Sequence, residues 1–377
     1  MQLRRITTSG NWIPEIDGLR FIAIVATLLV HMFGEVYTRS GHDFISQYHY
    51  DFFKLVDRGD RGVSLFFVIS GFILAQPFLR QHLEHAKAVS IKGYFKRRLT
   101  RLEPPYILSL LLYLFAVSLF KHQFLSLLPH FFAQVFYLHN FIFNYGSLNF
   151  VTWSLEVEVQ FYIVAPLLGY LYAISRPVLR RGIMICLIVA SILIQVHGGQ
   201  SLIAWNFPGQ LQFFLVGFLI ADVRATQTKS WQSRRWDLAS LLVWPAIFGL
   251  EKSNFFAFLF PVLIFIAYLA AFNGPVSRGI FQTKWIALTG GMCYSFYLMH
   301  MLVIDCVFKF TKKIIIPSSL MLSFSSQVFL LGICIYIFCT FYFVLIERPC
   351  MDPKWPGKLM ARIRNRRHSP SDMIAGD

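Results

Sequence analysis

Two polar side chains, Arg20 and His31, interrupt the first strongly apolar segment of the chain and restrict what it can fold into. The ten residues between them carry no charge, which is typical of a membrane helix. A charged or titratable group on such a helix is costly unless it is paired or faces a wet cavity. Eleven positions correspond to about three helical turns and roughly 16 Å of rise, so both side chains lie on one face. The sequence therefore predicts one helix with a cation and a proton-transfer group at two depths.

A simpler interpretation of the same pair remains open. Arg20 could extend from a helix end to the interface, and His31 could lie at the opposite interface, with no functional role for either.

The composition indicates a membrane protein. Hydrophobic residues make up 56% of the chain, aromatic residues 17% and charged residues only 14%, with a mean hydropathy of +0.56. Soluble domains carry about 25% charged residues, and a soluble fold of this composition would expose too much apolar surface. We therefore expect an all-α polytopic membrane protein with about ten transmembrane helices in one bundle. The expected spans are 19–34, 62–79, 104–120, 157–175, 182–196, 203–221, 237–250, 254–272, 286–308 and 326–346.

The apolar stretch at 124–143 differs from these spans. It contains Pro129, His130, His139 and Asn140, so we expect an interfacial or re-entrant segment rather than a span.

The net charge of +16 indicates topology rather than nucleic-acid binding. Basic clusters at 80–101, 176–181, 224–235 and 354–367 all fall on the side of the N-terminus if there are ten spans. The positive-inside rule then places both termini in the cytoplasm of a multi-pass inner or plasma membrane protein, although the lysines at 309–313 break the pattern. Residues 1–350 form one expected transmembrane domain, and 351–377 form a basic cytoplasmic tail. Anionic lipid headgroups explain this charge, so we expect no nucleic-acid partner.

A basic pair stands at the expected cytoplasmic mouth of the third span. Arg98 and Arg101 are three residues apart and share a helical face. Two guanidinium groups side by side suit phosphate oxygens, whereas Arg97 fits a simple positive-inside anchor.

Two carboxylates, Glu156 and Glu158, begin the fourth span, which the topology places at the outer interface. Their side chains point about 200° apart on a helix, so one can face inward while the other meets water or a headgroup. Trp153 and Tyr162 flank them.

Further polar residues lie in the second and ninth spans. Ser70 stands among small residues that allow close helix packing, and packing alone explains it equally well. Tyr297 and His300 could be catalytic groups or satisfied packing groups.

Together these stretches resemble the acyltransferase 3 family of integral-membrane O-acyltransferases. The matching pieces, in chain order, are Asp17 to Arg20 followed after ten intervening residues by His31, Ser64–Phe72, the Arg-x-x-Arg pair Arg98 and Arg101, and Trp153 to Glu158 with Gln160 to Tyr162. Val159 departs from the pattern, because the family often has a second acid there, and either Glu156 or Glu158 could be the important carboxylate.

The resemblance implies a cytoplasmic acyl-CoA donor, by default acetyl-CoA, and a hydroxyl acceptor on a glycan, a lipid-linked sugar or a small natural product. We expect His31 to act as base or transient acyl carrier, with Glu158 as the second catalytic group. We expect Asp17, Arg20, Arg98 and Arg101 to bind the donor. The remaining candidates, for acceptor binding or support, are Ser70, Trp153, Tyr162, Tyr297 and His300. No metal and no permanently bound cofactor is expected, and acyl-CoA is a co-substrate.

Two other functions use the same residues. A proton-coupled transporter of a small anionic solute also needs buried His, Arg and Glu, but it predicts helix breakers in matched halves, which the sequence lacks. A non-catalytic membrane receptor for an anion would not need a proton-transfer group at His31.

Overall fold

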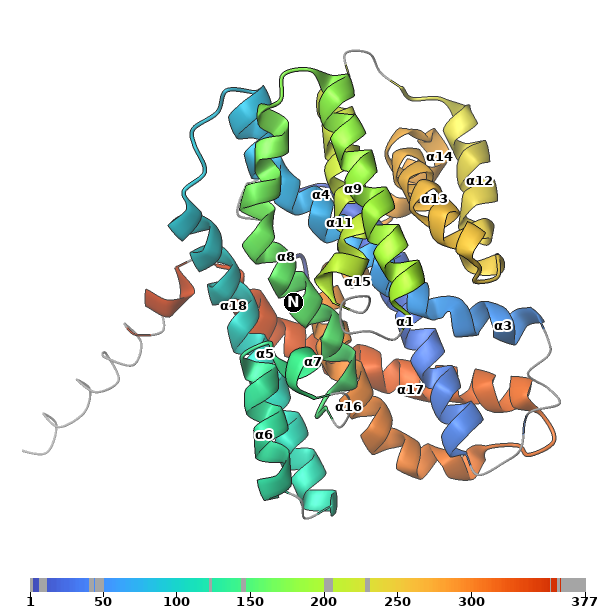
Figure 1. Cartoon of the computed structure of the whole chain (residues 1–377). Coiled ribbons are helices and arrows are strands. Elements are labelled where there is room, and N and C mark those ends of the chain that lie inside the picture. Colours follow the sequence, from blue (N-terminus) through green and yellow to red (C-terminus); the bar gives the residue numbers. More distant parts are fainter. Residues whose placement is uncertain are drawn as a thin grey trace, which may run out of the picture.

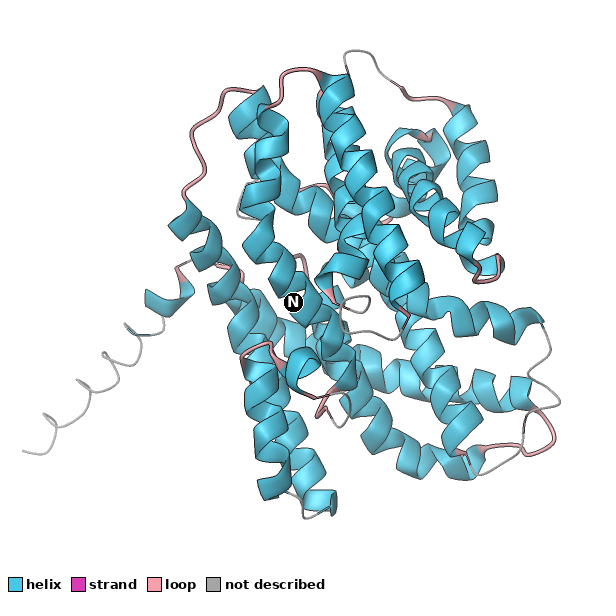
Figure 2. Cartoon of the chain, viewed as in Figure 1, coloured by secondary structure: helices cyan, strands magenta, loops and turns pink. Residues whose placement is uncertain are grey.

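The structure, a computed structural model, consists of helices joined by loops, with no strand in the part of the chain that it describes (Figures 1 and 2). It describes residues 3–6, 12–40, 44, 51–121, 124–143, 147–199, 206–227, 231–352, 354–357 and 360. The α-helices are α1 (Pro14–Arg39), α3 (Asp51–Asp57), α4 (Arg61–Leu83), α5 (Ile91–Lys121), α6 (Phe124–Val135), α7 (His139–Ile142), α8 (Trp153–Gly169), α9 (Pro177–Gly198), α11 (Phe207–Ala225), α12 (Arg234–Gly249), α13 (Asn254–Asn273), α14 (Pro275–Gln282), α15 (Lys284–Gly291), α16 (Cys293–Thr311), α17 (Leu320–Tyr342) and α18 (Arg348–Cys350).

The all-helical membrane class is confirmed, whereas the count of ten spans is not. Within the described ranges, seven helical stretches are long and apolar enough to cross a membrane. Four of them are α1, α5, α9 and α13, and the other three are α4 with the short helices before it, α16 with the short turn after it, and α17 with the short helices after it. The expected spans 157–175, 203–221 and 237–250 are helical as α8, α11 and α12 but are not among the seven. Helices α8 and α12 are only 17 and 16 residues long, and α11 carries two glutamines, an aspartate and an arginine.

Helix α1 lies inside the bundle because its glycines and its neighbours' glycines allow close approach. A methyl group built on Gly290 of α15 would lie 1.7 Å from the carbonyl oxygen of Asp17, and one on Gly18 would lie 2.4 Å from that of Phe281. The expected span 286–308 is also interrupted here, since α15 ends at Gly291 and α16 begins two residues later. This packing carries the polar end of α1 into the protein rather than to its surface.

Helices α4 and α11 cross through a reciprocal glycine contact. A methyl group on Gly71 would lie 2.1 Å from the Phe214 carbonyl oxygen, and one on Gly217 would lie 2.3 Å from that of Val68. The close helix packing expected of the small residues around Ser70 is therefore confirmed at its neighbour Gly71. One hydrophobic core surrounds this crossing and includes residues of α8, α9 and α13, while a second one joins α1, α5, α16 and α17 (Figure 1).

The segment after α5 runs back into the protein and does not span it. Helix α6 lies beside α5, and the chain then passes through α7 to a short 3₁₀ turn, Phe150–Thr152, which leads into α8 (Figure 1). The side chain of Gln134 donates to the Asn149 carbonyl and the Thr152 hydroxyl and accepts from the Leu148 amide. Irregular backbone at membrane depth needs such internal partners. The expectation of an interfacial or re-entrant segment agrees with this path.

The two ends of the described chain lie together, and the C-terminal end also contacts α5. The indole of Trp355 donates to the Thr100 carbonyl at 2.8 Å, and the Arg348 guanidinium donates to the Arg4 carbonyl at 3.2 Å. Most of the expected basic tail, 351–377, lies outside the described residues.

Candidate active site

The first turns of α1 place Asp17 at the centre of three donors. Its carboxylate accepts hydrogen bonds from Arg20 at 2.5 Å, from the Trp12 indole at 2.7 Å and from Arg5 at 2.9 Å. Asp17 is 1% exposed and Arg20 is 9% exposed, so this ion pair is removed from water. The expected buried pairing of Arg20 is present, and a simple extension of Arg20 to the interface is not what the structure contains.

The basic run on α5 separates into an outer and an inner face. Arg97 is exposed, whereas Arg98 is partly buried, stacks on the Tyr94 ring at 3.8 Å and donates to the Tyr94 carbonyl at 3.2 Å. Arg101, one turn further, is partly buried and makes no hydrogen bond or ion pair with the residues that the structure describes. Its charge instead interacts at longer range with the carboxylates of Asp17 and others. Arg101 thus keeps its guanidinium donors available.

Glu158 lies with this basic pair. Its Oε1 accepts a hydrogen bond from the Tyr162 hydroxyl at 2.6 Å and another from the Ser70 hydroxyl. The Tyr94 hydroxyl donates to the Tyr162 carbonyl, and the carboxylate interacts electrostatically with Arg98 and Arg101. We refer to Asp17, Arg20, Arg98, Arg101 and Glu158 as the charged cluster.

This arrangement corrects the expected geometry. The sequence places Glu158 and Tyr162 at the outer interface and Arg98 at the opposite mouth, yet Arg98 lies 5.8 Å from the Tyr162 ring. The reason is the re-entrant segment, which returns the chain to the interior before α8 starts. Helix α8, which carries Glu158, therefore begins inside the protein rather than at a surface.

The neighbouring carboxylate, Glu156, has a different environment. Its Oε2 accepts the backbone amide of Asn140 at 2.8 Å, and the Asn140 side chain donates to the Trp153 carbonyl. Glu156 is 1% exposed, whereas Glu158 is partly exposed, so the two carboxylates differ in their exposure. The hydrogen bond that Glu156 accepts fixes the start of α7. Of the two glutamates of α8, Glu158 is therefore the one that belongs to the charged cluster.

His31 lies further along α1, against two aromatic rings. Its imidazole centroid is 5.2 Å from the ring of Phe150 on the re-entrant segment and 5.2 Å from that of His300 on α16. His31 is partly exposed, whereas His300 is fully buried. The structure thus brings together two of the predicted residues that are 269 positions apart.

Tyr297 connects the histidines to α8. Its hydroxyl donates to the Val151 carbonyl at 2.7 Å and lies 3.0 Å from the Ser154 hydroxyl. Ser154 is one helical turn before Glu158 and shares its face. Tyr297 and Ser154 thus link α16, which carries His300, to α8, which carries Glu158.

Three participants are absent from the sequence-based prediction. Arg5 and Trp12 precede the first span and bind Asp17. Glu347 ends a π-helical segment, Phe343–Glu347, and its Oε2 accepts the backbone amide of Ser295 at 3.0 Å and its hydroxyl at 2.5 Å. Glu347 is 1% exposed and interacts electrostatically with Arg101. The only sequence signal is one acid after a long apolar run, which equally describes a helix end.

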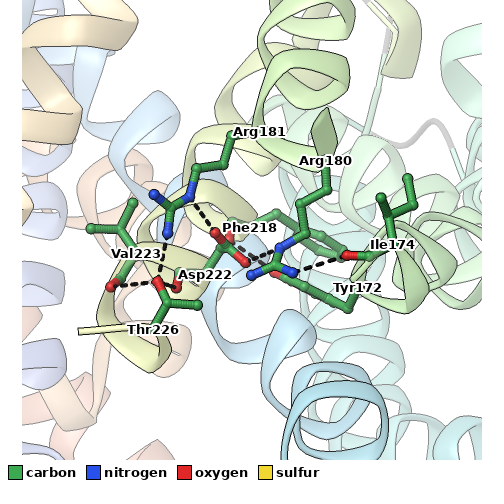
Figure 3. Close-up of polar contacts among 8 residues, drawn as sticks. All are labelled: Tyr172, Ile174, Arg180, Arg181, Phe218, Asp222, Val223 and Thr226. Carbon is green, nitrogen blue, oxygen red and sulfur yellow. Dashed lines mark hydrogen bonds and ion pairs between the residues drawn. The ribbon is translucent and has the colours of Figure 1, made fainter. Parts of the chain in front are cut away.

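A second buried ion cluster is remote from these residues and joins α9 to α11 (Figure 3). Asp222 accepts from Arg180 and from Arg181, each at 2.5 Å, and both Asp222 and Arg180 are almost inaccessible to water. Arg181 also donates to the Thr226 hydroxyl, and Arg180 donates to the Ile174 carbonyl. Among the buried side-chain atoms of this cluster, Nη2 of Arg180 lacks a hydrogen-bond partner in the described part of the chain, and the bonds to Asp222 hold the two helices together.

No group of three or more metal-ligating side chains is arranged around a common point in the described ranges. The side chains of the site supply guanidinium, carboxylate, phenol and imidazole groups. The site has more arginines than carboxylates, which leaves an excess of positive charge suited to an anionic ligand. The arginines are Arg5, Arg20, Arg98 and Arg101, and the carboxylates are Asp17, Glu158 and Glu347.

The chain matches the model of a known protein family. The family model for the acyltransferase domain of family 3 matches residues 13–346, which include all the predicted site residues. No solved structure matches the chain significantly.

Several bacterial relatives share part of the sequence. O-acetyltransferase OatA of Staphylococcus aureus is 23% identical over 57% of this chain and 35% of its own length. A putative O-acetyltransferase of the same species is 26% identical over 56% of this chain and 35% of its own length. Peptidoglycan O-acetyltransferase OatA of Listeria monocytogenes is 27% identical over 47% and 28%, respectively. The chain thus matches about a third or less of the length of these relatives. The match over 13–346 establishes that the chain belongs to the acyltransferase 3 family.

Proposed function

We propose that the protein is a membrane O-acyltransferase that moves an acyl group, by default acetyl, from cytoplasmic acyl-CoA to a hydroxyl group of a glycan, a lipid-linked sugar or a small natural product. One observation carries the proposal. A single helix, α1, presents the buried Arg20 to a cluster with excess positive charge and, eleven residues further, presents the partly exposed His31 beside the ring of His300.

The charged cluster suits the phosphates of the donor. Arg101 has donors without a hydrogen-bond partner in the described part of the chain, and Arg98 is held beside it by Tyr94. Arginine binds phosphate oxygens through two parallel hydrogen bonds. We assign Arg98 and Arg101 to the phosphates, with Arg20 fixed by Asp17 as a neighbouring cation. The rise of roughly 16 Å along α1 from Arg20 to His31 is a distance that an extended pantetheine arm can cover.

The transfer itself requires removal of one proton from the acceptor hydroxyl. His31 is partly exposed, so a hydroxyl can reach its ring. As the hydroxyl oxygen attacks the thioester carbonyl, the proton passes to His31, the carbon–sulfur bond breaks and the CoA sulfur receives the proton. In the alternative route, His31 first accepts the acyl group and then gives it to the hydroxyl. Both routes give the same products, an ester and free CoA.

The acceptor class is proposed from the relatives. The Listeria monocytogenes relative is named a peptidoglycan O-acetyltransferase, which makes a cell-envelope glycan the first acceptor to test. We further propose a plasma-membrane location with both termini in the cytoplasm, because the basic clusters then lie on the cytoplasmic side.

The test uses the full chain in lipid nanodiscs with radiolabelled acetyl-CoA and candidate glycans, and measures thioester loss together with labelled product. His31→Ala is expected to lower turnover by about 10²- to 10⁴-fold, the usual contribution of a general base. The control is His197→Ala, which changes an exposed histidine on α9 that bonds only to its own helix. Normal turnover in His31→Ala contradicts the assignment. Solute uptake by proteoliposomes without thioester loss would instead support the proton-coupled transporter.

A further inference from the structure

His300 is fully buried in α16 and has one ring nitrogen without a partner. Its Nδ1 lies 2.7 Å from the Phe296 carbonyl oxygen and 2.9 Å from that of Tyr297. Both oxygens only accept, so Nδ1 carries the proton. Nε2 of the neutral ring is then a bare acceptor, and it is buried without a hydrogen-bond partner among the residues that the structure describes. A buried acceptor without a donor is costly, so its retention points to a partner that the static structure does not yet engage.

The nearest polar ring is that of His31, and the chain supplies its own reference for such a pair. The rings of His130 and His139 have centroids 5.3 Å apart at an interplanar angle of 39°, and their Nδ1 and Nε2 atoms are 3.1 Å apart. The rings of His31 and His300 have centroids 5.2 Å apart at 35°. The two separations and angles are almost the same, so the His31 and His300 rings are spaced and tilted as in a pair that forms a nitrogen–nitrogen hydrogen bond.

We infer that His300 is a positioning residue for His31: its Nε2 accepts a hydrogen bond from a ring N–H of His31 and fixes which His31 nitrogen is free to take the acceptor proton. The inference rests on the proposed function, because it specifies how His31 works as a base. The proton taken from the hydroxyl stays on His31 until the CoA sulfur receives it. His300 gains and loses no proton.

A neutral acceptor suits this location. In serine hydrolases a carboxylate usually orients the catalytic histidine. A carboxylate buried beside a neutral imidazole at membrane depth carries a large desolvation cost, whereas a second imidazole carries much less. The bond to His300 strengthens only when His31 becomes a cation, so it stabilises the transition state more than the resting enzyme.

The carboxylates of Glu35 and Glu158 have other partners. Glu35, one turn further on α1, accepts a hydrogen bond from Arg39, which also binds Asp305. Glu158 accepts from Ser70 and Tyr162. Of the two rings in contact with His31, that of His300 carries a buried acceptor without a hydrogen-bond partner in the described part of the chain.

Two substitutions distinguish the roles of the two ring nitrogens of His300. His300→Asn keeps a donor near the position of Nδ1, and hence the bond to the helix, but removes the acceptor at Nε2. His300→Gln places an amide oxygen near the position of Nε2 and gives up the local bond. We expect kcat to fall about 10- to 100-fold in His300→Asn, the range for loss of one hydrogen bond to a charged group, and to recover largely in His300→Gln. The KM for acetyl-CoA should stay within about twofold in both variants.

The matched control is His197→Asn on α9. Its Nδ1 lies 3.0 Å from the carbonyl four residues earlier, but the side chain is exposed. This variant should keep the wild-type kcat. A merely structural role for His300 predicts the opposite order, with Asn tolerated and Gln impaired in parallel with the melting temperature, and that order would overturn the inference.

A second measurement does not depend on turnover. The ¹⁵N chemical shifts of the ring nitrogens report which His31 nitrogen carries the proton. We expect one His31 tautomer in the wild type and in His300→Gln, and a mixture in His300→Asn. If the wild type transfers no acyl group but this pattern is found, the proposed function fails and the positioning contact stands. An unchanged His31 tautomer in His300→Asn refutes the positioning role even if acyl transfer is normal.

Discussion

Replacement of Arg101 by lysine should weaken donor binding with little effect on folding. Arg101 has no hydrogen bond in the described part of the chain, so the substitution removes no internal hydrogen bond there. Lysine keeps the positive charge that the nearby carboxylates of Asp17, Glu158 and Glu347 require. What it loses is the planar pair of donors that binds a phosphate. One hydrogen bond to a charged group is worth about 1.5–3 kcal/mol, which corresponds to roughly a 10- to 150-fold rise in Kd.

The clean measurement is calorimetric binding of CoA, which cannot turn over, to the protein in nanodiscs. Arg97→Lys is the matched control, because Arg97 is exposed on the same helix. Arg98→Lys should weaken binding and also lower the melting temperature, because it gives up stacking on Tyr94.

A cycle with 3′-dephospho-CoA identifies the phosphate. If Arg101 binds the 3′-phosphate, the binding free energies lost on removal of the phosphate and on removal of the guanidinium should not add when both are removed. Equal Kd values for the wild type and Arg101→Lys would refute the reasoning and reduce Arg101 to a positive-inside anchor.

Three further outcomes are expected. Asp222→Asn leaves Arg180 buried without a counter-charge and should lower the unfolding free energy by about 3–5 kcal/mol, measured by thermal or denaturant unfolding in detergent; an unchanged melting temperature would argue against a clamp between α9 and α11. Glu158→Gln keeps the shape but removes the charge that faces the basic pair, so acyl transfer should drop at least about tenfold with normal folding, and full activity would remove Glu158 from the site. In a cysteine-free background, a cysteine at exposed position Ser318 should react with an impermeant maleimide from outside the cell, and one at Ala86 only after permeabilisation; the reverse pattern would invert the topology.

Several local features could be predicted from the sequence, because each depends on periodicity or composition within one segment. The low charge content fixed the all-helical membrane class. The eleven-residue spacing put Arg20 and His31 on one face of α1, and the three-residue spacing separated inward Arg98 and Arg101 from exposed Arg97. Proline and histidine within 124–143 marked a segment that does not span.

The partners of these groups could not be predicted in the same way, since contacts between helices depend on crossing geometry and on the depth at which each helix begins. The re-entrant segment decided that Glu158 meets Arg98 inside the protein, although the order of spans alone assigns them to opposite ends. The acid at Glu347 joined the site only because α17 ends beside α16.

The sequence by itself thus determined the class of protein, the faces of its helices and the residue types that chemistry requires. The tertiary structure alone decided which of those residues meet. His31 faces His300, and Arg101 faces three carboxylates from separate helices, because close glycine contacts draw α1 into the bundle and bring distant helices to the same depth. Helical periodicity encodes the direction of a side chain, but only the packing of the whole bundle encodes its neighbour.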